Sequence, residues 1–293
     1  MLFLRSTVVL VIKLENRDFP YAAAEDSLQV DIDSLLQWAV VNRMKFHPDK
    51  CKLLRCTHKR SPLDIRYFLG NSEINSHSSE TDLGVHTTQK LSFTEHQNKT
   101  LSKFSQRLGL VKRVCTLIDS CHKRRTLYVS LVRSLFEHCC QVWRPVSDAG
   151  LIKFEKLQKR AVKWVNNEED VSYDHKTYMS KLKQCNLLPI SKKFMFSDLK
   201  LFHKIFYGTT PTLLPSFLHK YDRISDYRRY TRLQNNRDST DIICTEQPRS
   251  DTFVHSYFYR CHKEWNKLPT DMRNVVEHDH FCTRLNEFLL ETI

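Results

Sequence analysis

Residues 28–55 read LQVDIDSLLQWAVVNRMKFHPDKCKLLR, a stretch in which a helical pattern gives way to a strand pattern. Apolar residues recur at helical spacing from Asp26 to Asn42, which predicts a helix capped by Asp26 or Ser27. The predicted inner face of this helix comprises Leu28, Ile32, Leu35, Leu36, Ala39 and Val40. A Pro-Asp turn follows, and the apolar run Lys52–Cys56 predicts a short strand. The stretch therefore indicates mixed α/β structure.

Short elements on either side extend this α/β segment. The β-branched and aliphatic run Thr7–Ile12 predicts a buried strand. Tyr67–Ile74 predicts a hairpin that bends at Gly70-Asn71, and Thr81–Val85 predicts another short strand. We expect a small α/β domain over residues 1–92.

Beyond Phe93 helical patterns dominate, and the whole chain of 293 residues contains only 5 Gly. The predicted helices are His96–Cys115, His122–Cys140, Leu151–Val165, Tyr178–Leu188, Ser191–Tyr207, Phe253–Leu268 and His278–Leu290. Residues 220–249 are polar and lack periodicity, which predicts a basic loop. The expected fold class is α+β and mostly helical, with helical regions at 93–170 and 171–293.

Spacing also predicts the inner faces of two of these helices. In the helix that begins at His122, the inward residues are Leu127, Leu131, Leu135 and Phe136. In the helix that begins at Leu151, they are Ile152, Leu157, Ala161, Trp164 and Val165. The outward residues of this second helix are all basic, namely Lys153, Lys156, Lys159, Arg160 and Lys163.

The chain carries 46 Lys and Arg against 33 Asp and Glu, a formal net charge of +13. The excess divides into +7 for residues 1–150 and +6 for residues 151–293, so it does not come from a terminal tail. A chain this basic favours a polyanionic partner, of which nucleic acid is the commonest. The alternative is a basic protein that its charge keeps in solution.

Neither the termini nor the ten cysteines indicate secretion. The apolar run near the N-terminus is far shorter than the ~20 residues of a membrane helix, and no CxxC pair is present. We expect an intracellular protein, nuclear or cytoplasmic, without a membrane partner. A possible zinc site at Cys261, His278, His280 and Cys282 has a spacing that fits no established pattern, so scattered core and surface residues are the favoured interpretation.

Motifs in the opening stretch resemble the segment that follows the catalytic aspartates in reverse transcriptases of jockey-like non-LTR (LINE-type) retrotransposons. The shared positions are Leu28, Gln29, Asp31, Leu35, Trp38, Asn42, Met44, Phe46, Pro48, Lys50 and Cys51. His47 replaces the asparagine that is usual in that family.

Later blocks resemble the same family in the same order. They are Asp82–Val85, Leu91–Phe93 with His96, Leu131–Arg133, Trp143–Pro145, Leu157–Ala161 and Trp265–Pro269. Each block alone is weak, whereas six or so in the right order are specific.

The resemblance implies a palm segment that follows the catalytic residues (1–92), a thumb (93–170) and a C-terminal helical region (171–293). Polymerases of the family hold two metal ions with an adjacent pair of aspartates, and this chain has no Asp-Asp pair. We therefore expect a truncated chain without polymerase activity of its own. It should need no cofactor, and Mg²⁺ is expected only for a complete polymerase.

One residue has a possible catalytic role by resemblance. Lys50 aligns with a lysine of the palm's fourth motif, which in such enzymes lies near the leaving pyrophosphate. Without metal-binding carboxylates this lysine has no chemistry to assist, so a surface lysine after a turn is the favoured interpretation.

The sequence suggests three sets of nucleic-acid contacts, the first two from the resemblance and the third from local composition. The first is the hairpin that grips the primer, Leu83, Gly84 and Val85, although an ordinary tight hairpin fits these residues equally well. The second consists of thumb residues that could contact phosphates, namely Lys99, Lys103, Arg107, Lys112, Arg113, Arg124 and Arg125. The third combines arginines for phosphates and tyrosines for stacking on RNA bases, namely Arg223, Arg228, Arg229, Arg232, Tyr227 and Tyr230. A solvated basic surface without a partner is the alternative for the last two sets.

Three hypotheses follow from the sequence. The leading one is a reverse-transcriptase-derived fragment that binds template–primer duplex or RNA. The second is a portion of an active RNA-directed DNA polymerase whose upstream sequence supplies the aspartates. The third is a domesticated interaction protein without enzymatic activity.

Overall fold

The computed structural model describes residues 2–3, 9–13, 21–56, 65–221, 239–248 and 250–293. The chain forms two compact units, Met1–Asn98 and Lys99–Ile293. Its content of 56% helix and 11% strand confirms the expected α+β, mostly helical class. In the segments that the structure describes, no helix combines the length and the apolar character needed to cross a membrane.

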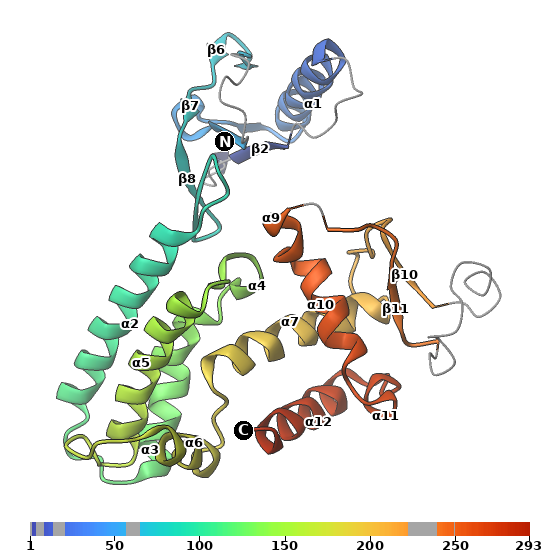
Figure 1. The fold of residues 1–293 in the computed structure, drawn as a ribbon. Helices are drawn as coiled ribbons and strands as arrows, with labels where there is room; N and C mark the ends of the chain where they lie inside the picture. The colour runs from blue at the N-terminus through green and yellow to red at the C-terminus, as the bar shows by residue number, and fades with distance from the viewer. Residues whose placement is uncertain (1, 4–8, 14–20, 57–64, 222–238, 249) are drawn as a thin grey trace. The chain divides into compact units, whose positions relative to one another are not determined.

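The first unit is built on a three-stranded parallel sheet in the order β2 (Val9–Lys13), β4 (Lys52–Cys56) and β7 (Ser76–His77). Helix α1 (Tyr21–Val41) connects β2 to β4, because neighbouring parallel strands need a crossover connection (Figure 1). Strand β4 has the predicted bounds. Beside the sheet, β1 (Leu2–Phe3) pairs with β3 (Met44–Lys45), and a 3-10 turn (Pro48–Lys50) leads into β4.

Helix α1 corrects two predictions. It begins at Tyr21, so Asp26 and Ser27 lie inside the helix and neither is its N-cap. The added turn contains three alanines, the residue with the highest helix propensity. Ile32 and Ala39 are buried as predicted, but Leu35 is 41% and Val40 75% exposed, because only a narrow stripe of the helix is covered.

Two hairpins complete the first unit. Strands β5 (Phe68–Leu69) and β6 (Ser72–Glu73) form the predicted hairpin around Gly70. The predicted single strand Thr81–Val85 is instead the bend between β8 (Ser79–Asp82) and β9 (Val85–Thr88). Leu83 and Gly84 both have positive φ, +47° and +84°, as two-residue hairpin turns require. The sequence pattern missed this turn because leucine is uncommon in that conformation.

The conformation of Gly84 leads to a stability prediction. Replacing Gly84 with Ala should cost about 1 kcal/mol, because a Cβ disfavours the left-handed backbone region. Gly84→Asn should cost less than half as much, since asparagine tolerates this region. Native-state hydrogen exchange at the β8–β9 amides measures both changes, and equal protection in Gly84→Ala and the parent chain would contradict the assignment of the turn.

The second unit contains most of the helices (Figure 1). They are α2 (Thr94–Val114, which begins in the first unit), α3 (Cys121–Leu127), α4 (Cys140–Trp143), α5 (Asp148–Val165), α6 (His175–Gln184), α7 (Ile190–Phe206), α9 (Asp251–Val254), α10 (Tyr257–Asn266), α11 (Thr270–Arg273) and α12 (His278–Glu291). Helix α7 lies at the centre of this unit and contacts α5 and α4 as well as α10 and α12. The predicted helices at 96–115, 151–165, 191–207 and 278–290 are therefore confirmed with small shifts at their ends.

The segment predicted as one helix from His122 to Cys140 is broken. After α3 it continues as a π-helical turn (Tyr128–Val132) and a 3-10 turn (Arg133–Phe136), and Cys139 then has a positive φ of 50°. Tyr128, Val132, Arg133 and Phe136 are buried, whereas Leu131 is 45% exposed, contrary to the prediction. The looser winding keeps residues four apart on one face and turns Leu131 outward.

Other boundaries also differ from the expected ones. Ser256 separates α9 from α10 within the predicted helix Phe253–Leu268. Strand β11 (Ile242–Cys244) lies within the predicted loop and pairs antiparallel with β10 (Leu218–Lys220), at the start of that loop. Contacts also cross the expected boundary at residue 170, since Gln158 donates to the carbonyl oxygen of Leu188 at 3.0 Å.

The core of the second unit is rich in aromatic residues. Phe136 stacks on Phe104 with ring centroids 5.4 Å apart and meets Phe154 and Phe194 edge to face. Trp265 packs against Phe206 and Phe202 beneath α12. These large buried rings hold α2, α5, α7 and α10 in fixed positions.

Candidate nucleic-acid interface

Helix α5 separates apolar and basic residues most completely. The side chain of Ser147 caps it by accepting from the N–H of Gly150, at 3.2 Å. Its buried face consists of Phe154, Gln158, Ala161, Val162, Trp164 and Val165. Ile152 is 51% exposed, which corrects the prediction that it faces the core.

The outer face of α5 is basic and contains no acid. The only acidic residue after the first turn, Glu155, points inward and accepts from the Tyr178 hydroxyl and from the N–H of Ile190. Burial raises the pKa of the Glu155 carboxyl, although its hydrogen bonds oppose the shift. Glu155 therefore cannot neutralise the lysines and arginine on the opposite face.

Three cations of this outer face project into solvent. Lys153, Lys156 and Arg160 are exposed and form no ion pair or hydrogen bond with any residue that the structure describes. Lys159 donates to the carbonyl oxygen of Tyr173, and the ammonium group of Lys163 lies 5.5 Å from the Tyr173 ring centroid. The first three are therefore available to an external anion. We call Lys153, Lys156 and Arg160 the α5 basic face.

Helix α2 places the predicted thumb residues in two groups. Lys99, Lys103 and Arg107 follow one another at four-residue spacing, which aligns them along one side of the helix. Lys103 and Arg113 are exposed, and Arg107 is exposed while donating to the carbonyl oxygen of Leu131 at 3.2 Å. Lys112 instead pairs with Glu169 at 2.5 Å, so its charge is already balanced.

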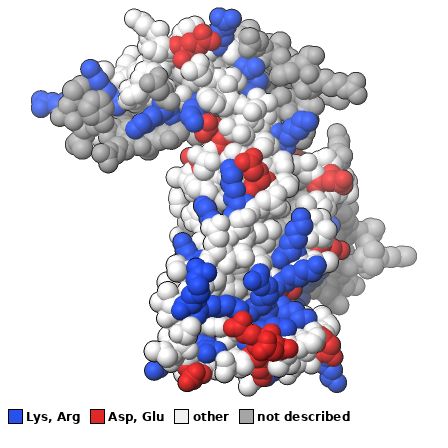
Figure 2. All heavy atoms as spheres, turned by 90° about the vertical axis from the view of Figure 1, so that its left-hand side faces the viewer, with Lys and Arg blue, Asp and Glu red and all other residues white. Residues whose placement is uncertain are grey.

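The ion pair of Lys112 also ties the end of α2 to the segment just beyond α5. Both helices therefore end in the same part of the unit. Figure 2 shows many Lys and Arg side chains on the face in view, with one group of Asp and Glu side chains near its lower end and others scattered above. The acidic residues Glu168 and Glu169 follow α5, and they pair with Lys181 and Lys112.

The prediction that Arg124 contacts phosphate is wrong, because this side chain is buried. It is 5% exposed, and its guanidinium donates to the carbonyl oxygens of Ile118 and Trp164 and to the side chain of Asn167. It also lies over the Trp164 ring. Every one of these partners is within the protein, so Arg124 stabilises the fold and is not exposed to a phosphate.

Arg125 has a similar structural role. Its guanidinium donates to the carbonyl oxygens of Cys185 and Asn186, just after α6. These oxygens end a helix, where carbonyl groups lack intrahelical partners. Arg125 is half-buried, and its contact with phosphate stays a prediction.

Two candidates of the first unit lie on exposed turns. Leu83 and Gly84 form the tip of the β8–β9 hairpin, while Val85 is buried at its base. The hairpin is attached to the start of α2 by His86, whose Nε2 lies 2.8 Å from Glu95 Oε2.

Lys50 ends the exposed 3-10 turn before β4. The loop candidates Arg223, Tyr227, Arg228, Arg229, Tyr230 and Arg232 lie outside the described residues.

The zinc hypothesis for the C-terminal Cys and His residues is not supported by their positions. Cys261 is buried in the apolar core with Phe281 and Leu285, and burial raises its thiol pKa well above the usual value. His280 is exposed, while Cys282 lies 3.6 Å from His278. Across the described residues, no three His, Cys, Asp or Glu side chains are grouped closely enough to hold a metal ion.

The α5 basic face is visible in the sequence but is not included among the predicted contacts. Its outward lysines and arginine follow from helical spacing alone. What spacing cannot reveal is that Glu155 turns inward while Lys159 and Lys163 engage Tyr173. Those contacts depend on Tyr173 and on α6 and α7, which pack against α5.

Comparisons of this chain with models of protein families, with curated proteins and with solved structures find no match.

Proposed function

We propose that this chain binds nucleic acid through its sugar–phosphate backbone, and that it derives from the C-terminal part of a jockey-like non-LTR reverse transcriptase. The observation that carries the binding proposal is the α5 basic face, where three exposed cations lie on one helix face without an acid among them. Lys103, Arg107 and Arg113 of α2 supply further positive charge in the same unit. The derivation rests on the ordered motifs from Leu28 to Pro269.

The spacing of the α5 basic face suits a phosphate backbone. Lys153 and Arg160 are separated by seven residues, a rise of about 10 Å along a helix. Successive phosphates of one strand of duplex DNA advance by about 3.4 Å along the axis, so this face spans about three of them. Contacts of this kind position a protein on nucleic acid without selecting a base sequence.

The proposal is confined to binding. Two-metal nucleotidyl transfer needs clustered carboxylates, and the sequence contains no adjacent pair of aspartates. Lys50 by itself has no metal-bound triphosphate to act upon. Template–primer duplex, RNA and DNA all present the same phosphate chemistry to the α5 basic face.

Neutralising the α5 basic face tests the proposed function. The triple variant Lys153→Gln, Lys156→Gln and Arg160→Gln should reduce the salt dependence of binding by about 1 in log–log slope for each phosphate that the protein no longer neutralises. Fluorescence anisotropy with a labelled 20-base-pair RNA–DNA hybrid, titrated at several salt concentrations, measures that slope.

A matched variant separates a local contact from a general charge effect. Lys176→Gln, Lys183→Gln and Lys267→Gln remove the same charge from exposed positions on α6 and just after α10. This control should keep the parent slope. Equal reductions in the two triple variants would assign the binding to overall charge and remove the α5 basic face from the proposal.

A further inference from the structure

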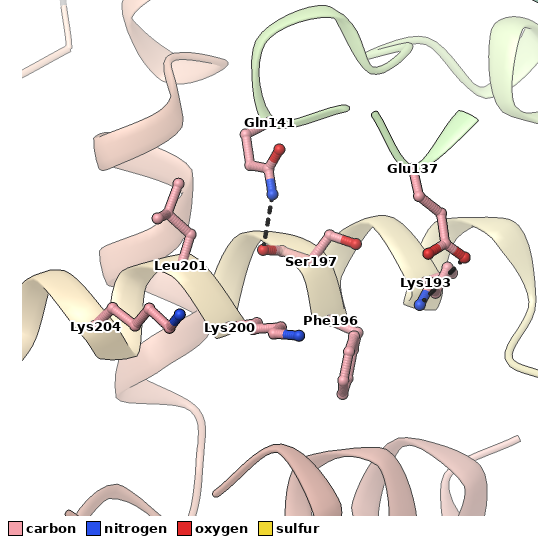
Figure 3. Close-up of a pocket in the computed structure, with 8 residues that line it drawn as sticks. All are labelled: Glu137, Gln141, Lys193, Phe196, Ser197, Lys200, Leu201 and Lys204. Carbon is pink, nitrogen blue, oxygen red and sulfur yellow. Dashed lines mark hydrogen bonds and ion pairs between the residues drawn. The ribbon is translucent and has the colours of Figure 1, made fainter. Parts of the chain in front are cut away.

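A pocket of about 300 Å³ lies beside α7, and Figure 3 shows the residues that line it. Lys193, Ser197, Lys200 and Lys204 line it from positions three, four and seven residues apart, which places them on the same side of the helix. Phe196 supplies an aromatic wall from α7 itself. The pocket belongs entirely to the second unit.

The lining of this α7 pocket is strongly positive. Its single acidic lining residue, Glu137, lies 3.3 Å from Lys193 and so balances one of the three lysines. The ammonium groups of Lys200 and Lys204 form no ion pair or hydrogen bond with residues in the described ranges. Two ammonium groups separated by one helical turn are thus left to attract a ligand.

A buried charge cluster lies directly behind the wall of the pocket. Asp198 pairs with both Arg144 and Arg260, so this cluster carries one more positive than negative charge. Gln141 joins the cluster to the pocket, since its carbonyl oxygen accepts from Arg260 and its amide donates to the Ser197 carbonyl oxygen at 3.1 Å. The excess positive charge adds to the attraction for an anion.

The field of the two free lysines extends to α12. The pKa of His278 is lowered by burial and then by the positive charges of Lys204 and Lys200. The same two charges oppose the rise in the thiol pKa that burial gives Cys282.

We propose that the α7 pocket binds the phosphate monoester of a nucleotide, with Lys200 and Lys204 on the phosphate and Phe196 beside the base. A phosphate monoester carries close to two negative charges at neutral pH, which matches two lysines. The volume lies at the lower end of the range for small-molecule pockets, which suits a mononucleotide better than a larger ligand. Lys193 Nζ lies 4.9 Å from the Phe196 ring centroid, so a base of any kind would stack on the opposite face of the ring.

The ligand can be a free nucleotide or the 5′-phosphorylated end of a strand, since both present the same group. Isothermal titration of the full chain with AMP, with adenosine as the ligand without phosphate, tests the first source. A 12-nucleotide strand with a 5′-phosphate, compared with the same strand ending in a hydroxyl, tests the second. The variant is Lys200→Gln with Lys204→Gln, and the control is Lys176→Gln with Lys183→Gln, which removes equal charge from α6.

The expected result is phosphate-dependent binding that the double variant weakens at least ~10-fold and the control leaves unchanged. A gain for AMP over adenosine identifies a free nucleotide, and a gain for the phosphorylated strand over the hydroxyl strand identifies a strand end. If neither phosphate group improves binding, or if the double variant keeps the gain, the proposal is wrong. The hydroxyl strand lacks the phosphate monoester, so its binding reports on the backbone contacts proposed for α5 and α2, and the two proposals can fail separately.

Discussion

Replacing Asp198 with Ala is expected to lower the free energy of unfolding of the second unit by about 3–5 kcal/mol. Asp198 is 3% exposed and accepts hydrogen bonds from Arg260 at 2.9 and 3.0 Å, while Arg144 lies 2.8 Å away. Removing the carboxylate leaves two guanidinium groups buried without a counterion. Breaking a buried pair in this way is far more costly than losing an exposed one.

The two arginines respond to Asp198 in different ways. Burial disfavours the charged form of both, and for Arg144 it dominates and lowers the guanidinium pKa. For Arg260 the hydrogen bonds and charge of Asp198 outweigh burial, and its pKa is raised. Arg260 is thus the closer partner. It also donates to the Gln141 carbonyl oxygen, so loss of Asp198 should loosen α10 from α4 and α7.

Urea unfolding followed by tryptophan fluorescence measures the effect of Asp198→Ala. Trp143, Trp164 and Trp265 are buried in the second unit, so their emission reports its unfolding. Asp198→Asn, which keeps the shape and removes the charge, should lose a comparable amount. Glu287→Ala at an exposed position of α12 should change stability by less than about 0.5 kcal/mol. A loss below about 1 kcal/mol in Asp198→Ala would contradict the role assigned to this cluster.

Replacing Arg124 with Ala should destabilise the same unit by about 3 kcal/mol, because hydrogen bonds to charged groups contribute about 1.5–3 kcal/mol each. The Arg124 guanidinium lies 2.9 Å from both the Trp164 carbonyl oxygen and Asn167 Oδ1. Its loss leaves the carbonyl oxygens of Trp164 and Ile118 without that donor. It also removes the cation that lies over the Trp164 ring.

Arg124→Ala also distinguishes a structural arginine from one that contacts phosphate. Under conditions in which the variant remains folded, its salt dependence of nucleic-acid binding should equal that of the parent chain. Lys123→Ala at the adjacent exposed position serves as the stability control and should cost less than about 0.5 kcal/mol. A stable Arg124→Ala protein with a reduced salt slope would return Arg124 to the contact surface.

The long helices can be predicted from the sequence because their pattern is local. Helices α2, α5, α7 and α12 bury residues three and four apart, and each begins or ends within a few residues of its predicted limits. Strand β4 is predictable for the same reason, as a compact apolar run. Elements whose form depends on distant partners are not, such as the π-helical turn at Tyr128, whose hydroxyl donates to Gln158.

The candidate interface is less predictable than the helices. Residue type and spacing place Arg124 beside Lys123 and Arg125 in one basic run, but only tertiary contacts show that Arg124 is buried. In the same way, the sequence does not show that Lys112 is paired with Glu169 while Lys103 is not. The α7 pocket combines residues from α7 with Glu137 and Gln141, about 60 residues earlier in the chain, so no local motif marks it.

The salt dependence of binding to an RNA–DNA hybrid by the parent chain tests the central proposal most directly. If the α5 basic face and the exposed cations of α2 contact phosphates, the plot of log Kobs against log salt concentration should fall with a slope of about −3 or steeper. This estimate takes about 0.9 for each neutralised phosphate of a duplex. A slope near zero, or binding that persists unchanged at high salt, would contradict the proposal that this protein binds nucleic acid through its phosphates.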